Sequence, residues 1–456
     1  MTNPVKANTN TPNIIGKQAV VIGAGIAGIS AARVLTDFYD RVIVLERDDL
    51  PSQDRPRAGA PQGRHPHLLL GGGYAALSEL FPEIGRDFEF AGAIPLAAGR
   101  DLGCEIPGLG FLPKRDFGIQ SFAMTRPVLE LVLRRRVKAM RNIEWRENSR
   151  AIEIMTAIHG ARVIGVKYEQ GDGREVVVGA DLVVDASGHA ILSMGCLQAS
   201  GYQLPHVDAI GVDLGYATGL FELPSAVAPD FTAMVTLPTA PESSRSGYML
   251  RVGDALWQVL LVGRGQDRPP SDLSAFHDFA ATLPSSTIAN ALRHADPRSE
   301  IARFRFRESI CRHFGELSHL PKGLVPIGDT FCRFNPVYGQ GMSVAALEAV
   351  LLRRVLIEHA ASVSPLAYLA TDFASQAEAL IEGPWGMSAI PDFVYPETTG
   401  ARPKNLADEL QRQATAYRDA MDNADIHRDL YERMHLMNTV VPQRASIDRG
   451  HVDWLA

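Results

Sequence analysis

The sequence predicts an α/β fold of two interleaved parts, followed by helices at the C-terminal end. An apolar run at residues 18–23 ends in a glycine cluster, and small and apolar residues continue at helical spacing through residues 26–35. A second apolar run, residues 41–45, completes a β-α-β unit of about 30 residues. The middle of the chain predicts antiparallel strands at residues 210–223, 231–237 and 248–262. Residues 406–437 are charged and helical in pattern.

The remaining helices and strands are predicted from the same spacing of apolar residues. Helices are predicted at residues 126–140, 273–283 and 342–359, and strands at residues 161–168, 175–178, 182–184 and 324–327. Residues 49–73 are dense in Pro, Gly, Arg and His and have no period, so they predict a long loop without helices or strands. Loops of this length are usually functional.

Composition and charge restrict the class of protein. The 456 residues are 46% hydrophobic and 21% charged, which is typical of a folded globular chain. A net charge of -7 without a long basic run argues against nucleic acid as a partner. Residues 1–17 lack the apolar block of a signal peptide, and no run of about 18 apolar residues could span a membrane. We therefore expect a cytoplasmic protein, disordered at residues 1–16.

Three glycines at the end of the first predicted strand have the spacing of a dinucleotide-binding turn. Gly23 would make the tight turn, Gly25 would let the backbone approach a pyrophosphate, and Gly28 would let the helix pack on the strand. Glu46 ends the next strand about 20 residues later, where a carboxylate can accept a hydrogen bond from a ribose hydroxyl. Together they predict a Rossmann-like domain with a bound dinucleotide.

A second glycine cluster, far along the chain, indicates which dinucleotide. Asp329 follows a late strand, where it could hold a hydroxyl chain. Gly339 and Gly341 precede a helix and would bring backbone N–H groups to the electron-rich edge of a flavin. A protein that binds only NAD has no need of this second site, although a glycine-rich turn without a ligand is the alternative.

With these motifs the chain resembles the flavoprotein monooxygenase superfamily, which includes aromatic hydroxylases, squalene and polyether-type epoxidases, and flavin-dependent halogenases. The resemblance covers most of the first 360 residues. It implies an FAD-binding domain of the glutathione-reductase type, in which Glu46 and the neighbouring Arg47 bind the ADP half of FAD. It also implies that Asp329 binds the ribityl and pyrophosphate portion. The positions from Pro336 to Met342 would flank the isoalloxazine, and Arg126 would point to the FAD phosphates unless it is a solvated helix arginine.

The same reasoning divides the chain into domains. The FAD-binding domain is predicted at residues 17–80, 122–200 and 301–360, the substrate domain at residues 81–121 and 201–300, and a C-terminal helical region at residues 361–456.

Two features depart from common patterns of the superfamily. Ser187 and Gly188 stand where Asp-Gly is usual, which leaves the way in which NAD(P)H is recognised open. The four tryptophans form no Trp-x-Trp pair of the halogenase type, so halogenation ranks below oxygen insertion. The loop at residues 55–67 carries Arg57 and His65, which are candidates for contacts with flavin or NAD(P)H, or for structural hydrogen bonds. No set of metal ligands is predicted.

The resemblance implies an FAD-dependent monooxygenase that uses NADPH or NADH as a transient reductant, or a separate flavin reductase. O₂ would add at flavin C4a, and the resulting hydroperoxide would hydroxylate or epoxidise a hydrophobic or aromatic small molecule, in secondary metabolism. An FAD-dependent dehydrogenase or reductase on the same fold is the first alternative. A non-catalytic escort protein with a dinucleotide-binding fold is the second.

Overall fold

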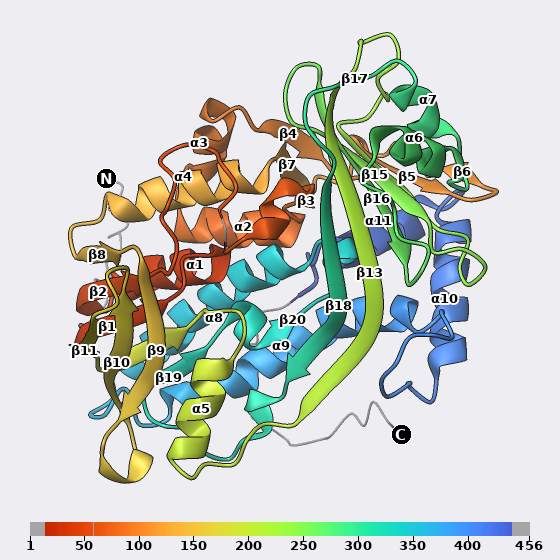
Figure 1. The fold of residues 1–456 in the computed structure, drawn as a ribbon. Coiled ribbons are helices and arrows are strands. Elements are labelled where there is room, and N and C mark those ends of the chain that lie inside the picture. Colours follow the sequence, from red (N-terminus) through yellow and green to blue (C-terminus); the bar gives the residue numbers. More distant parts are fainter. Residues whose placement is uncertain (1–13, 58, 440–456) are drawn as a thin grey trace, which may run out of the picture.

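The computed structural model describes residues 14–57 and 59–439 (Figure 1). Of the stretch predicted to be disordered, residues 1–13 lie outside the described part, whereas Gly16 already begins the first strand. The end of the predicted C-terminal region, residues 440–456, lies outside it as well.

A parallel sheet of five strands forms the centre of the cofactor side, in the order β19-β12-β1-β2-β8. Its strands are β1 (Gly16–Ile22), β2 (Tyr39–Leu45), β8 (Ile143–Arg146), β12 (Leu182–Asp185) and β19 (Leu324–Pro326). Residues 19–22 of β1 and 182–184 of β12 are apolar and buried, as is typical of parallel strands covered on both faces. The predicted β-α-β unit is confirmed.

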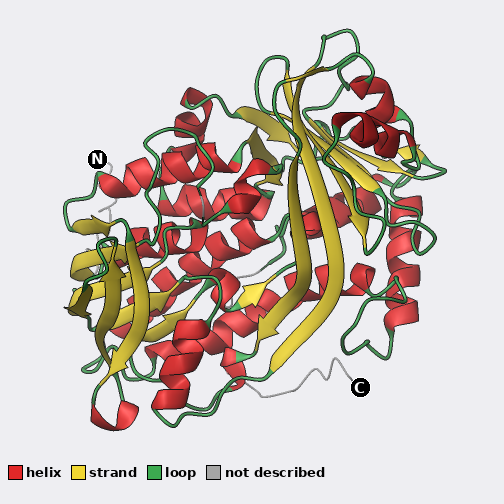
Figure 2. Ribbon diagram, viewed as in Figure 1, coloured by secondary structure: helices red, strands yellow, loops and turns green. Residues whose placement is uncertain are grey.

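Helices and a small sheet share one apolar core with the parallel sheet (Figure 2). The helices are α1 (Ile26–Leu35), α2 (Gly71–Leu80), α3 (Ile84–Phe90), α4 (Arg126–Lys138), α5 (Ile191–Ala199), α8 (Gly341–Ala360) and α9 (Leu369–Asp392). The small antiparallel sheet consists of β9 (Ser149–Thr156), β10 (Val163–Gln170) and β11 (Glu175–Gly179).

A long, mostly antiparallel sheet of nine strands lies beside this core, in the order β20-β18-β13-β16-β15-β14-β5-β6, with β17 paired to β13. Its strands are β5 (Leu102–Ile106), β6 (Gly110–Phe111), β13 (Val207–Glu222), β14 (Ala233–Thr236), β15 (Ser246–Arg251), β16 (Leu256–Arg264), β17 (Asp296–Pro297), β18 (Ala302–Arg312) and β20 (Cys332–Arg333). Helices α6 (Leu273–Ala281) and α7 (Thr287–Leu292) pack on one of its faces. The run predicted at 248–262 is two strands, because residues 252–255 turn the chain.

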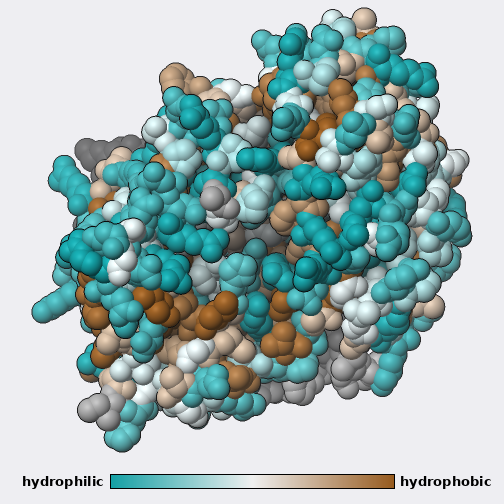
Figure 3. All heavy atoms as spheres, viewed as in Figure 1, coloured by the Kyte–Doolittle hydropathy of each residue, from teal (hydrophilic) through white to brown (hydrophobic). Residues whose placement is uncertain are grey.

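The remaining elements connect or cover these layers. Strands β3 (His67–Leu68), β4 (Ile94–Ala97) and β7 (Gln120–Met124) form a three-stranded sheet. The segment at 406–437, predicted to be helical, forms α10 (Leu406–Asp419) and α11 (Ala424–Met434). Figure 3 shows that hydrophilic residues cover most of one face of the molecule, with smaller hydrophobic patches.

The prediction of an element-free loop at 49–73 is wrong at its C-terminal end. Residues Pro61–Arg64 form a 3-10 helix, and α2 already begins at Gly71. The glycines there serve close packing rather than a turn, because a Cβ at Gly72 would lie 2.5 Å from the carbonyl oxygen of Leu436. The division into domains stays a prediction, and β18 of the long sheet falls within residues 301–360.

Candidate functional site

A cavity of about 1860 Å³ lies between the parallel sheet and the long sheet. Nearly all residues proposed from the sequence line it: Gly23, Gly25, Glu46, Arg47, Arg57, His65, Arg126, Asp329, Pro336, Gly339, Gly341 and Met342. They come from segments as far apart as β1 and α8, and the fold brings them together because the carboxyl ends of β1, β2 and the late strand β19 share one edge of the sheet. Gly28 does not line the cavity and lies beneath the turn.

The glycine turn after β1 has the geometry that its spacing requires. Gly23 has φ +99°, a conformation that favours glycine, and a Cβ on Gly28 would lie only 1.9 Å from the carbonyl oxygen of Gly23. Above Gly25 there is open space, and the nearest atom to a Cβ there would be Nη2 of Arg57, at 3.8 Å. Helix α1 starts directly afterwards without a side-chain cap, so its first N–H groups face the cavity edge where a phosphate can bind.

Glu46 and Arg57 belong to a buried cluster of charges beside this turn. Oε2 of Glu46 accepts a hydrogen bond from the Ala24 backbone at 2.7 Å, which ties the end of β2 to the turn. The guanidinium of Arg57 lies 3.3 Å from Glu46, 2.9 Å from Asp48 and 3.2 Å from Glu130. Its side chain is only 8% exposed, so Arg57 is a fixed positive charge next to Gly25.

Arg126 and Glu130 continue this cluster on α4. Nε of Arg126 lies 2.9 Å from Oε1 of Glu130, one helical turn away. Burial raises the pKa of Glu130, but Arg126 and Arg57 outweigh burial and hold it below its ordinary value. Arg126 therefore stands in the cavity wall rather than in solvent. Glu130 was not selected from the sequence, although its i, i+4 spacing from Arg126 was a readable signal.

The same loop reaches the opposite wall through His65. Nδ1 of His65 lies 2.7 Å from Oγ1 of Thr218 on β13, and the ring is 3% exposed. Burial, with Arg64 nearby, lowers the pKa of His65 to about 4, so the ring is neutral at pH 7. His67 donates from Nδ1 to the carbonyl of His65 at 2.8 Å, and burial lowers its pKa to about 3. Arg57 and His65 thus anchor one loop to both walls.

The second glycine cluster forms the floor of the cavity. The backbone N–H of Gly328, which has φ +66°, donates to Oε2 of the buried Glu348 at 2.8 Å. Burial raises the pKa of Glu348 to about 8, so this carboxyl is protonated at pH 7. The Asp329 side chain is open to the cavity but enclosed by protein, and this enclosure raises its pKa, although Arg126 and Arg333 act in the opposite direction.

The Ser187–Gly188 pair lies on the same edge. Asp185, fully buried at the end of β12, accepts from the Ser187 backbone at 3.0 Å, and Gly188 donates to Oγ1 of Thr330 at 2.9 Å. The Ser187–Gly188 pair is therefore held against the segment that carries Asp329.

Beyond the residues predicted to bind the cofactor, the cavity continues into a chamber with mostly apolar walls. The long sheet, α9, α10 and α11 supply these walls, including Met234, Val235, Leu250, Leu260, Val262, Phe306, Met387, Ile390, Leu410 and Met434. Phenols also line the chamber, at Tyr216, Tyr248, Tyr338, Tyr395 and Tyr417. Periodicity could not select these residues, because any core strand would carry the same types.

Among the described residues, no helix is both long enough and apolar enough to cross a bilayer.

A search against protein-family models finds no match. Two curated relatives align along most of the chain. Protein Rv3254 of Mycobacterium tuberculosis is 34% identical over 393 residues, which are 84% of this chain and 81% of the relative. Squalene epoxidase 2, mitochondrial, of Arabidopsis thaliana is 25% identical over 363 residues, which are 77% of this chain and 56% of the relative.

Solved structures share the fold. The flavin-dependent brominase Bmp2 superposes with a TM-score of 0.65 at 13% identity, covering 92% of this chain and 93% of its own. The p-nitrophenol 4-monooxygenase PnpA from Pseudomonas putida superposes with a TM-score of 0.62 at 17% identity, covering 93% of this chain and 99% of its own. At these identities the likeness establishes the architecture and no substrate.

Proposed function

Because this chain belongs to the FAD-dependent monooxygenase superfamily, we propose that it inserts one oxygen atom of O₂ into a hydrophobic or aromatic small molecule. NADPH or NADH, bound transiently, or a separate flavin reductase would supply the electrons. The product would be a hydroxylated or epoxidised compound of secondary metabolism, made in the cytoplasm. When bound, FAD would supply the redox chemistry and the activation of O₂.

One observation supports this proposal above the others: the dinucleotide turn opens into the same cavity as the apolar chamber. A volume of about 1860 Å³ exceeds the roughly 300 to 1,000 Å³ of an ordinary small-molecule site, so it has room for a cofactor and a substrate together. The open space above Gly25 and the fixed cation of Arg57 fit a pyrophosphate, and Glu46 fits a ribose.

The residues of the chain would bind the cofactor, orient it and shield the reacting atoms from water. The N–H groups at the start of α1 and the guanidinium of Arg57 would hold the phosphates. Backbone N–H groups after Gly339, at the N-terminal end of α8, would face the ring edge that becomes negative on reduction. The apolar chamber would keep water from the reacting atoms. None of these roles requires a catalytic triad or a pair of catalytic carboxylates.

The first test is the absorbance spectrum of the purified protein, followed by NADPH or NADH oxidation under air. We expect flavin bands near about 375 and 450 nm and slow, oxygen-dependent turnover that releases peroxide while substrate is absent. A colourless protein that cannot be reconstituted with FAD would refute the proposal. A yellow protein that NAD(P)H or dithionite reduces and O₂ does not reoxidise would be a dehydrogenase instead.

A further inference from the structure

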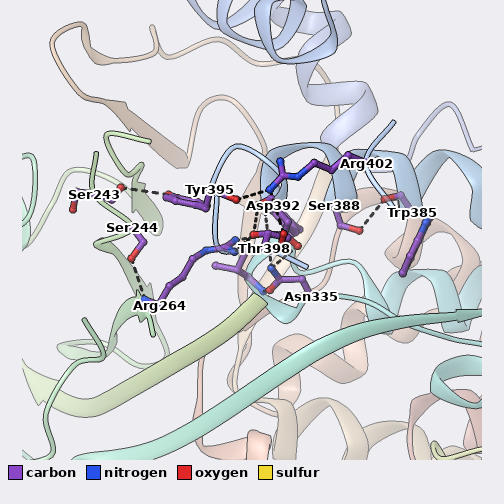
Figure 4. A network of polar contacts seen from close by, with 12 residues as sticks. Ser243, Ser244, Arg264, Asn335, Trp385, Ser388, Asp392, Tyr395, Thr398 and Arg402 are labelled. Carbon is purple, nitrogen blue, oxygen red and sulfur yellow. Dashed lines mark hydrogen bonds and ion pairs between the residues drawn. The ribbon is translucent and has the colours of Figure 1, made fainter. Parts of the chain in front are cut away.

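A buried carboxylate, Asp392, lies at the end of α9 where three distant segments meet (Figure 4). Arg264 reaches it from the end of β16, and Asn335 and Tyr338 reach it from the turn before α8. Nδ2 of Asn335 donates to both carboxylate oxygens, at 2.9 and 3.0 Å, and the Tyr338 hydroxyl donates to Oδ1 at 3.1 Å. Nη2 of Arg264 forms an ion pair with the same oxygen.

The partners of Asp392 oppose the effect of its burial. The pKa of Asp392 lies above its ordinary value because burial raises it, although Arg264, Asn335 and Tyr338 act in the opposite direction. Each of these three side chains donates to the carboxyl oxygens. The cluster thus pairs one carboxyl group with one guanidinium and two neutral donors.

This carboxylate holds both ends of the turn that enters α8. Asn335 is fully buried, and its Oδ1 accepts from the Val337 backbone at 3.1 Å, which caps the 3-10 helix Pro336–Tyr338. Its amide group is simultaneously fixed by Asp392. Tyr338, at the other end of the 3-10 helix, contacts Asp392 as well, and Gly339 follows with φ +68°. We call residues 335–341 the glycine turn.

The same carboxylate restrains a cation in the chamber wall. Arg264 lines the cavity, and its guanidinium lies 4.3 Å from the centre of the Tyr395 ring. Nη1 of Arg264 donates to Oγ1 of Thr398 at 3.2 Å, and Thr398 donates in turn to the Asp392 backbone carbonyl at 2.6 Å. The position of Arg264 is thus defined by the segment that follows α9.

We propose that Asp392 is a positioning residue that fixes the glycine turn and Arg264 in one arrangement. A single side chain would thus hold groups in place on both the cofactor side and the substrate side of the cavity. The inference rests on the proposed function, because that function places the flavin ring against the glycine turn. It assigns α9 a role that none of the sequence motifs indicated: its end connects the floor of the cavity to the long sheet.

Three variants test this role. Asp392→Ala removes the acceptor, and Asp392→Asn keeps one oxygen for Asn335 and Tyr338 without the charge. Arg402→Gln is the matched control, because Arg402 braces the same segment through the carbonyls of Phe393, Tyr395 and Thr398 but is not among the partners of Asp392 or of the glycine turn.

Amide hydrogen exchange of residues 335–341 is measured first, in the apoprotein, and FAD dissociation constants and visible circular dichroism of the bound flavin follow. We expect Asp392→Ala to speed exchange in the glycine turn at least about tenfold and to weaken FAD binding by about tenfold, which corresponds to the loss of one charge-assisted hydrogen bond. Asp392→Asn should restore slow exchange, and Arg402→Gln should leave exchange in the turn and the flavin spectrum at wild-type values.

Two results would overturn the inference. Wild-type exchange at residues 335–341 in Asp392→Ala would show that the turn holds its shape alone. Equal acceleration in Arg402→Gln would show a general loosening of the segment after α9. A wild-type protein that binds no FAD would refute the proposed function, while the exchange rates would still decide whether Asp392 positions the turn.

Discussion

The replacement Arg57→Met removes the one guanidinium shared by Glu46, Asp48 and Glu130. All three carboxylates lie within 3.3 Å of it, and the Arg57 side chain is only 8% exposed. Each contact corresponds to about 5 kcal/mol of attraction at an effective dielectric constant of about 20, most of which offsets the cost of burying the charges. Losing one partner of such a cluster costs about 3 to 5 kcal/mol of the free energy of unfolding.

The loss of unfolding free energy in Arg57→Met should depend on pH in a defined direction. Arg126 and Arg57, against the effect of burial, hold the pKa of Glu130 below its ordinary value. A carboxylate with a lowered pKa contributes stability above its unfolded-state pKa, near about 4.3, and that stability is lost as the pH falls through the folded-state value. The difference between wild type and Arg57→Met should therefore be full at pH 7.5 and should shrink below about pH 4.

Urea unfolding of the apoprotein at pH 7.5 and at a pH below about 4 measures this difference in unfolding free energy without the contribution of a ligand. Arg55→Met is the control, because Arg55 is exposed on the same loop and its replacement should change the free energy of unfolding by less than about 0.5 kcal/mol. A loss below about 1 kcal/mol for Arg57→Met, or the same loss at both pH values, would refute the view that Arg57 holds this cluster together.

Three further predictions concern residues in the cavity wall or directly beneath it. Gly28→Ala should abolish FAD binding, because its Cβ would lie 1.9 Å from the Gly23 carbonyl oxygen, whereas Gly195→Ala meets nothing within 4 Å; flavin absorbance after purification checks both. Since burial lowers the pKa of His65 to about 4, the stability that its neutral ring contributes is full above about pH 6.5 and is lost as the pH falls toward 4. His65→Gln should flatten the fall in unfolding free energy across this window by up to about 3 kcal/mol, and parallel wild-type and variant curves would contradict this. Burial raises the pKa of Glu348 to about 8, so Glu348→Gln should gain up to about 4 kcal/mol over wild type as the pH rises from 4.5 to 8, which urea unfolding at several pH values can measure.

The sequence predicted well those features that a short segment determines on its own. The turn at residues 23–28 and the strand end at Asp329 were readable, because a strand, a glycine turn and a helix follow each other within a few residues. The edge of a parallel sheet then brings such ends together whatever the intervening sequence.

Contacts between distant segments were not readable from one sequence. Nothing in the residues around Asp392 indicates that Asn335 and Arg264 will meet there, 57 and 128 positions away in the chain. Arg57 was selected for its loop, but its acidic partners depend on how that loop folds back over β2 and α4. The glycines at the start of α2 predict a loop from sequence alone, because their role in close helix packing appears only in three dimensions.

The continuity of the cavity has a practical consequence for ligand discovery. In the described part of the chain, the pocket beside residues 23–28 and the apolar chamber form one continuous cavity, so the isoalloxazine itself would close the chamber on one side. A screen against the cofactor-free protein would thus favour long, nucleotide-like compounds that occupy the cofactor channel. Compounds that report on substrate preference should be sought only after the flavin has been loaded, when the shape available to them is the one met during turnover.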